Sequence, residues 1–174
     1  MAESMAIESS GSSGQSFTPI KVSEFKQILV DWLTANQGRV AGAYNSGGGW
    51  ELWLHVELYL AVKTKYPNAD IVREASSYKT KSLRADLVLN SRCQGAAMCI
   101  IEIKTELMSE LYTAFWTRVG LDVDKGQEVK QSAGKTVVAL AVAITLKPET
   151  WQAVRNEVGE KTKIGNIGCY STMG

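Results

Sequence analysis

Two apolar, β-branched segments contain charged residues at positions where a buried strand would have apolar ones. The first spans residues 84–89 and contains Asp86, and the second spans residues 99–104 and contains Glu102 and Lys104. Runs of this length and composition are typical of buried strands. An isolated charge is costly to bury unless it is paired or binds a metal. The two segments therefore predict a functional site built on neighbouring strands.

Residues 90–95, which separate these segments, are rich in turn-forming residues, so we expect an antiparallel hairpin centred near Gln94. This register places Asp86 roughly opposite Glu102, with Cβ atoms about 4.5–5.5 Å apart. Side chains alternate along a strand, so Glu102 and Lys104 share a face. Two carboxylates this close repel unless one is protonated or a cation lies between them. The pair therefore predicts a hard divalent cation, above all Mg²⁺.

A third acid is expected from a helix over residues 50–65. Helical spacing places Glu51 and His55 on its polar face and Glu57 near the centre of its apolar face. We expect Glu57 to approach a metal site on the sheet, the alternative being an ion pair with a lysine or arginine. His55 is expected at the surface or near the site. As the only histidine, it argues against histidine-ligated zinc and a Ser-His-Asp triad.

A helix glutamate, a strand aspartate and a Glu-x-Lys motif on the next strand resemble the PD-(D/E)XK nuclease superfamily, over roughly residues 50–145. The resemblance implies an α/β protein with a three-layer, restriction-endonuclease-like core. In that core, helices flank a mixed sheet in the order αβββαβ, here with an extra N-terminal helix. Ala85 stands where many members have a proline.

The same resemblance implies a role for each site residue. Lys104 would orient or activate the attacking water and stabilise charge in the transition state. The ligands of Mg²⁺ or Mn²⁺ would be Asp86, Glu102, Glu57 and the carbonyl of Ile103.

These observations favour a metal-dependent endonuclease that hydrolyses phosphodiester bonds. DNA is the favoured substrate, because most of the superfamily cuts DNA, and RNA is the alternative. Two other readings stay open. One is a nuclease-like module that binds nucleic acid or protein without catalysis. The other is an unrelated α/β binding protein in which Glu102 and Lys104 form a solvent-facing pair and Asp86 caps a turn.

The net charge of +1 shows no general excess of basic residues, so nucleic-acid binding needs a local basic patch. The segment that leads to Asp86 supplies one, and an ordinary solvated loop is the alternative. Its candidates for contacting phosphates or stacking on a base are Arg73, Tyr78, Lys79, Lys81 and Arg84.

The chain length of 174 residues suits one domain, expected over residues 17–174 after a Ser- and Gly-rich disordered tail at 1–16. The three cysteines show neither metal-site spacing nor a disulfide framework. No apolar run approaches the roughly 20 residues of a membrane span, and no secretory signal is visible. These patterns favour an intracellular protein, cytoplasmic or nuclear, with no membrane partner. A homodimer stays open.

Further elements follow from the pattern of apolar residues. Residues 136–145 are nearly all apolar and predict a central strand covered on both faces. The tail from Lys161 is ambiguous. Asp124, Lys125 and Gln127 are expected on a solvated helix face, the alternative being that they line the site. We expect another strand over 69–75 and helices over 21–35, 106–119, 121–132 and from Pro148 to near Gly159.

Overall fold

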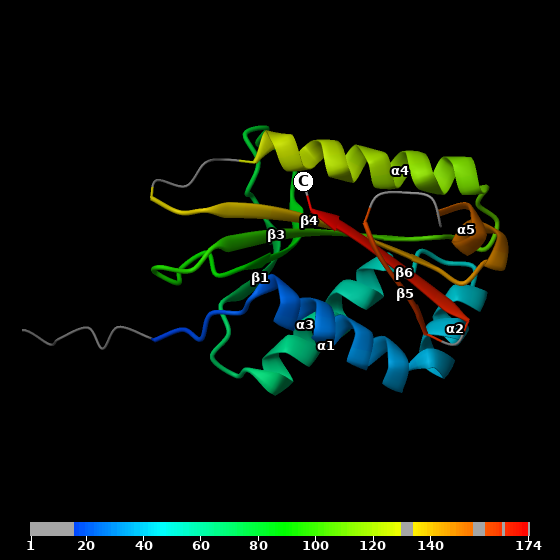
Figure 1. Cartoon of the computed structure of the whole chain (residues 1–174), viewed down its shortest axis with the longest axis horizontal. Coiled ribbons are helices and arrows are strands. Elements are labelled where there is room, and N and C mark those ends of the chain that lie inside the picture. Colours follow the sequence, from blue (N-terminus) through cyan, green and yellow to red (C-terminus); the bar gives the residue numbers. More distant parts are fainter. Residues whose placement is uncertain (1–15, 130–133, 155–158, 165, 174) are drawn as a thin grey trace, which may run out of the picture.

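The computed structural model describes residues 16–129, 134–154, 159–164 and 166–173. They form a mixed six-stranded sheet with helices on both faces, which confirms the predicted α/β class (Figure 1). In chain order the elements are α1 (Val22–Ala35), α2 (Gln37–Asn45), α3 (Glu51–Lys65), β1 (Ile71–Ala75), β2 (Ala85–Leu89), β3 (Met98–Thr105), α4 (Tyr112–Lys125), the 3₁₀ turn η1 (Gly126–Glu128), β4 (Val137–Thr145), α5 (Pro148–Ala153), β5 (Glu160–Ile164) and β6 (Ile167–Met173).

The strands are arranged in the order β1-β2-β3-β4-β6-β5. β1, β2 and β3 form an antiparallel meander, and β4 runs parallel to β3 after the crossover through α4. β6 pairs antiparallel with β4, and β5 with β6. From α3 to β4 the chain therefore follows the order helix, three strands, helix, strand. The terminal hairpin of β5 and β6 and the helix α2 were not predicted.

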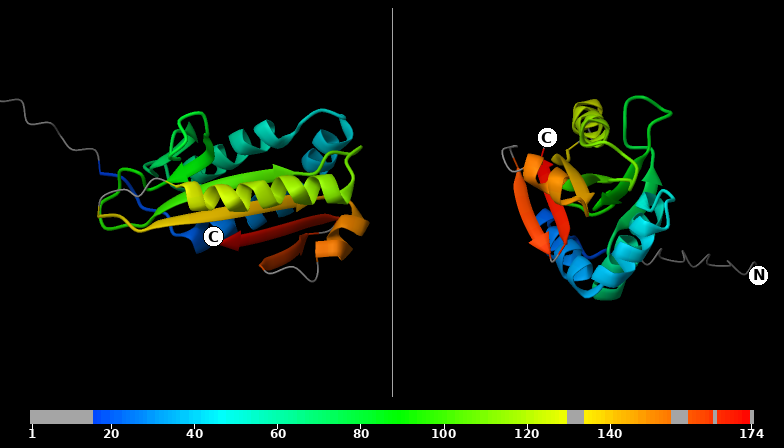
Figure 2. Two further views of the ribbon diagram at one scale, coloured as in Figure 1. Left: turned by 90° about the horizontal axis from the view of Figure 1, so that it is seen from above. Right: turned by 90° about the vertical axis from the view of Figure 1, so that its right-hand side faces the viewer.

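The sheet separates two helical layers. α1 and α3 cover one face and α4 crosses the other (Figures 1 and 2). Alternation along β3 sends Ile101 and Ile103 into the large core under α1 and α3, whereas Ile100 packs in a smaller cluster on the opposite face. Glu102 and Lys104 continue the row of Ile100, and both form ion pairs with residues of α4. The sequence alternation thus places these two charges beneath α4.

The helix boundaries around Gly120 differ from those predicted. We expected a helix that ends before Gly120 and a second one after it, but α4 continues through this residue. A glycine inside a helix costs about 1 kcal/mol relative to alanine. The burial of Phe115 and Val119 against the sheet outweighs this cost. Residues 106–111, predicted to be helical, precede α4 as a loop.

Other predictions from the sequence have mixed outcomes. β4 confirms the central strand, and Cys93, Cys99 and Cys169 are buried and free. The expected tail falls almost entirely on residues 1–15, which lie outside the described residues, as do 130–132 and 155–158 of the expected helices. None of the helices in the described ranges has the length and apolar character that a transmembrane span requires.

Candidate active site

Asp86 and Glu102 lie opposite each other on β2 and β3, as the hairpin register predicts. The ladder pairs Leu87 with Ile101, and one further step along both strands brings Asp86 across from Glu102. The regular pairing ends at this step. Beyond it, Asp86 Oδ2 accepts a hydrogen bond of 2.7 Å from the backbone N–H of Ile103. The two acids therefore lie where β2 and β3 separate.

Burial disfavours the ionised form of both acids. The side chain of Asp86 is 13% exposed, and burial raises its pKa to about 6, although the Ile103 N–H and Lys104 oppose the shift. Glu102 is 4% exposed, and burial together with the charge of Asp86 raises its pKa to about 7. A divalent cation would relieve both effects, and carboxylate oxygens are the ligands that Mg²⁺ and Mn²⁺ prefer. This pair of acids thus fits a hard cation.

Both carboxylate oxygens of Glu102 have partners from the protein. The hydroxyl of Tyr78 donates to Oε1, and Lys125 Nζ lies 3.1 Å from Oε2. Tyr78 is fully buried, so the prediction that it stacks on a base was wrong. Lys125 comes from the last turn of α4, which confirms the alternative that it lines the site.

Lys104 is held between two further acids. Its Nζ lies 2.8 Å from Glu51 Oε1 and 3.2 Å from Asp122 Oδ2. Burial opposes the charged form of Lys104, but these two carboxylates and Asp86 outweigh it, so its pKa is raised. Lys104 is therefore an ammonium group at neutral pH. An ammonium group can stabilise negative charge and donate hydrogen bonds, and it does not accept a proton.

Asp122 is the residue that the sequence reasoning missed completely. It is buried on α4 and contacts both lysines, since its Oδ1 lies 2.8 Å from Lys125 Nζ. The available signal was its position on the same helical stripe as Phe115 and Val119, which places a carboxylate on the core-facing side of α4.

The glutamate that α3 contributes to the site is Glu51 and not Glu57. Besides contacting Lys104, Glu51 accepts a hydrogen bond from the backbone N–H of Thr105 at 3.2 Å. Glu57 Oε1 lies 2.6 Å from Arg39 Nη2 of α2. Glu57 therefore forms the ion pair that was predicted as the alternative. The expectation that Glu57 reaches the sheet was wrong, and with it the geometric basis for its role as a ligand.

The error in Glu57 has a physical cause in the composition of α3. Apolar residues occur on every side of this helix, so their pattern does not define a single buried face. The residues that pack against the sheet include Leu54, Leu58 and His55, while Leu52 and Leu60 are 63% and 50% exposed. Contacts with the strands, rather than apolar spacing, decide which side faces inward.

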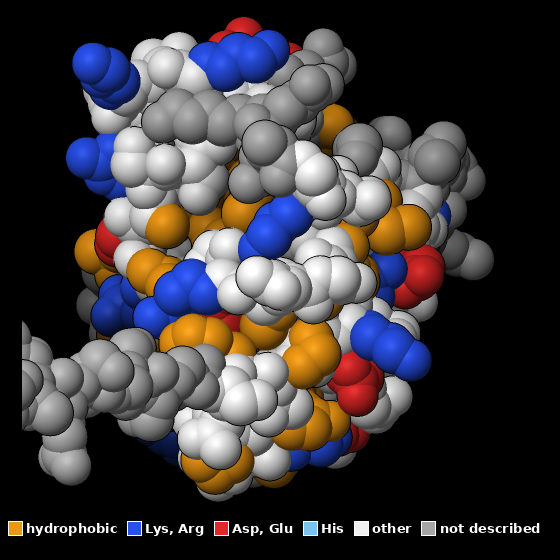
Figure 3. All heavy atoms as spheres, turned by 90° about the vertical axis from the view of Figure 1, so that its left-hand side faces the viewer, with side chains coloured by type: hydrophobic (Ala, Val, Ile, Leu, Met, Phe, Trp, Pro, Cys, Tyr) orange, Lys and Arg blue, Asp and Glu red, His pale blue; other side chains and the backbone are white. Residues whose placement is uncertain are grey.

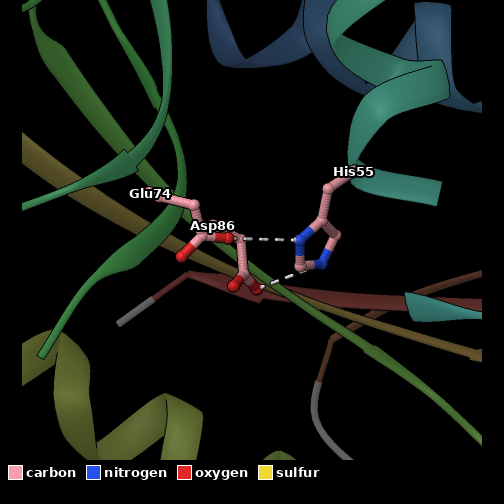
Figure 4. Close-up of side chains that lie close together, drawn as sticks. All are labelled: His55, Glu74 and Asp86. Atoms are coloured by element: carbon pink, nitrogen blue, oxygen red, sulfur yellow. Dashed lines mark ion pairs between the residues drawn. The ribbon is translucent and has the colours of Figure 1, made fainter. Parts of the chain in front are cut away.

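His55 lies beside the site on the same buried side of α3. Its Nε2 is 3.5 Å from Asp86 Oδ2, and its Nδ1 is 4.0 Å from Glu74 Oε1 of β1 (Figure 4). Burial lowers the pKa of His55, although Glu51, the backbone of Ile103 and Glu74 oppose the shift. We expected His55 on the polar face of the helix, at the surface or near the site. The side chain is 1% exposed, so the polar-face assignment was wrong, and the imidazole lies beside Asp86.

The basic residues predicted to contact nucleic acid lie along β1 and the loop that follows it. Arg73 is half-buried on β1, whereas Lys79, Lys81 and Arg84 are exposed on the loop. The Lys79 N–H donates to the carbonyl of Glu128, which links this loop to η1, directly after α4. The face in Figure 3 shows Lys and Arg side chains interspersed with hydrophobic and acidic ones.

Comparisons of the chain with protein-family models, with curated proteins and with solved structures found no match.

Proposed function

We propose that this chain is a metal-dependent nuclease of the PD-(D/E)XK type, with the restriction-endonuclease-like fold that this implies. The observation that carries the proposal is the opposed pair Asp86 and Glu102, with Lys104 two residues further along β3. All three charged side chains are largely buried. Lys104 beside Asp86 and Lys125 beside Glu102 do not bring the pKa of either acid down to its ordinary value. A group of this kind is suited to phosphodiester hydrolysis.

In this proposal Asp86, Glu102 and the carbonyl of Ile103 hold Mg²⁺ or Mn²⁺. A divalent ion held there would supply Lewis-acid chemistry, by lowering the pKa of water and neutralising charge on the phosphate. Lys104, fixed by Glu51 and Asp122, binds a non-bridging phosphate oxygen and stabilises the charge that develops there. Water attacks phosphorus in line and gives up one proton to solvent, the bond to the leaving sugar oxygen breaks, and that oxygen takes up a proton from solvent.

The substrate in this proposal is nucleic acid, with DNA favoured over RNA. Lys79, Lys81 and Arg84 are exposed on the loop whose Tyr78 contacts Glu102, so they lie on the segment that borders the acids. Cations in this position can bind the phosphates on either side of the scissile one and fix the register of the strand.

A second candidate function is nucleic-acid or protein binding by a nuclease-like module without catalysis. The observation in its favour is that the site is internally paired. Both oxygens of Glu102 have protein partners, and Lys104 is shared by two carboxylates. A buried charge network that is satisfied in this way can persist for structural reasons.

A cleavage screen separates the two functions. Single-stranded, duplex and branched DNA and RNA are incubated with the purified chain and Mg²⁺ or Mn²⁺. We expect cleavage of at least one substrate, a loss of orders of magnitude in turnover in Lys104→Ala, and little rescue in Lys104→Arg, whose guanidinium is larger. Lys65→Ala, an exposed lysine of α3, is the matched control.

Calorimetry with Mn²⁺ completes the test, because Asp86→Asn and Glu102→Gln should each lose affinity for the ion. A wild-type chain that binds Mn²⁺ and cuts no substrate would favour the binding module. Full activity in Lys104→Ala would remove Lys104 from the reaction.

A further inference from the structure

His55 is a buried polar side chain without an adequate partner. It is the only histidine of the sequence, and it is 1% exposed. Neither ring nitrogen meets hydrogen-bond geometry with a group of the described residues, although the backbone of Ile103 lies close enough to favour the charged ring. Buried polar groups in folded proteins nearly always have hydrogen-bond partners. An imidazole that lacks them on both nitrogens points to a partner that does not belong to the chain.

Two carboxylates face this imidazole. Asp86 of β2 and Glu74 of β1 each approach one of its nitrogens, as Figure 4 shows. One ligand atom from each of the three residues can be chosen so that all three atoms lie within 4.8 Å of one another. Two ligands about 2.1 Å from a tetrahedral ion are roughly 3.4 Å apart. The separation of 3.5 Å between His55 Nε2 and Asp86 Oδ2 already matches this value.

The backbone of β1 is distorted at the third residue of this group. Glu74 has a φ of +51°, in the left-handed region that non-glycine residues rarely adopt. Its neighbours Arg73 and Ala75 pair regularly with β2, so the distortion is confined to the position that faces Asp86. Backbone strain of this kind is concentrated at ligand sites. The side chain of Glu74 is 50% exposed and has room to rotate toward the imidazole.

We propose that His55, Glu74 and Asp86 bind a divalent transition-metal cation such as Zn²⁺, Co²⁺ or Mn²⁺. This departs from the expectation that a single histidine argues against histidine-ligated zinc, because two carboxylates supply the other ligands. This position is distinct from the one between Asp86 and Glu102, with Asp86 common to both. Imidazole nitrogen is a good ligand for these metals, whereas Mg²⁺ takes oxygen. One ring nitrogen binds the ion, the two acids supply oxygens, and solvent reaches the site along Glu74. The inference concerns the binding of an ion and does not require nuclease activity.

The single histidine makes the test direct, because imidazole signals of the untagged chain can come only from His55. Zn²⁺ alone is titrated into the ¹⁵N-labelled full chain, and the ring nitrogens are observed by long-range ¹H–¹⁵N correlation. We expect one ring nitrogen to move to the shift of a metal-bound nitrogen with Zn²⁺, and neither to do so with Mg²⁺. Ring signals that stay unchanged at saturating Zn²⁺ would overturn the proposal.

Calorimetry with the same ion assigns the other ligands. His55→Gln and Glu74→Gln should each weaken Zn²⁺ binding by about tenfold or more, while Glu102→Gln should weaken Mg²⁺ binding more than Zn²⁺ binding. Glu57→Gln, which alters an acid of the same helix that pairs with Arg39, is the control and should change neither affinity. Since Glu74 is half-exposed, its variant keeps the test decisive if His55→Gln fails to fold. Unchanged Zn²⁺ affinity in Glu74→Gln would contradict its place in the site.

The outcome is separable from that of the nuclease proposal. A metal-bound His55 signal in a chain that cuts no substrate would support the cation site and refute the nuclease. Cleavage by a chain whose His55 signal never responds to Zn²⁺ would do the reverse.

Discussion

Lys125 Nζ lies 3.1 Å from Glu102 Oε2, so the last turn of α4 places a positive charge against one of the two acids proposed to bind metal. Burial opposes the charge of Lys125, but Asp122 and Glu102 outweigh it and raise the pKa of the ammonium group. The lysine is therefore protonated at neutral pH. It supplies part of the charge compensation that a divalent cation would give to Glu102.

The first prediction concerns this competition. Lys125→Met keeps an unbranched side chain, one heavy atom shorter, and removes the charge, so that an ammonium group no longer competes with Mn²⁺ for Glu102. We expect calorimetry to show several-fold tighter Mn²⁺ binding in the variant. Without metal, the loss of a charged partner for a buried carboxylate should lower the free energy of unfolding by about 1–3 kcal/mol. Weaker Mn²⁺ binding in Lys125→Met would show that the lysine assists the ion.

The second prediction compares the two glutamates of α3. Glu51→Gln removes the charge that fixes Lys104 and lies 3.5 Å from Arg118, so turnover should fall by at least tenfold while metal affinity changes little. Glu57→Gln alters only the pair with Arg39, whose side chain is 55% exposed. A surface pair contributes about 0–1 kcal/mol, so this variant should remain stable and active. A folded Glu57→Gln variant that no longer cleaves, beside a fully active Glu51→Gln variant, would show that Glu57 and not Glu51 belongs to the site.

The difference between these glutamates shows where prediction from sequence reaches its limit. Asp86, Glu102 and Lys104 could be found because a charge inside an apolar strand is conspicuous and a strand has only two faces. The turn at residues 90–95 then fixes the register of the hairpin, since a slip of one residue would exchange the faces. A helix offers a continuous range of orientations, and α3 is apolar on most sides.

The fold was predictable to a similar extent and for similar reasons. The apolar strand β4 and the meander of β1 to β3 follow from composition and turn chemistry. The hairpin of β5 and β6 mixes glycine with polar residues, and only pairing with β4 makes it part of the sheet. The helix α2 has two glycines within nine residues, which local propensity disfavours. In both segments tertiary contacts outweigh the local preference.

The third prediction separates the buried tyrosine from the exposed basic residues of the same loop. Lys79→Ala and Lys81→Ala should weaken binding to duplex DNA and lower the salt slope of log affinity by about one per residue, because each removes one phosphate contact. Tyr78→Phe should leave the salt slope unchanged and lower the stability of the fold by about 1–2 kcal/mol, because a buried hydrogen bond to Glu102 is lost. Binding isotherms at three salt concentrations, together with thermal unfolding, provide the measurement. A loss of DNA affinity in Tyr78→Phe without loss of stability would contradict the buried role of this residue.

The last prediction concerns the pH dependence of the metal-free fold. The pKa of Asp86 is about 6 and that of Glu102 about 7 in the folded chain, both above the values of about 4 expected when the chain is unfolded. A carboxyl whose pKa is raised on folding contributes stability below its unfolded pKa and loses it as the pH rises through its folded pKa. The fold without metal should therefore lose stability between about pH 4 and pH 7.5, by on the order of 3 kcal/mol for each acid. Asp70 and Glu110 have lowered pKa values, so they reduce stability as the pH falls, chiefly below about pH 4. The lowered pKa of His55 opposes the predicted loss within the window, because the unfolded imidazole binds a proton more readily up to about pH 6.5.

Urea unfolding at a series of pH values in EDTA measures this slope. Asp86→Asn should reduce the slope and be more stable than the wild type at pH 8, while Asp31→Asn on the exposed side of α1 should leave it unchanged. Mn²⁺ should restore stability chiefly above pH 7, because only the ionised pair binds the cation, and this recovery should be absent in Asp86→Asn. If the stability of the metal-free chain instead rises between pH 5 and pH 8, Asp86 and Glu102 are already compensated by Lys104 and Lys125. The electrostatic reason for placing a cation between the two acids would then be lost.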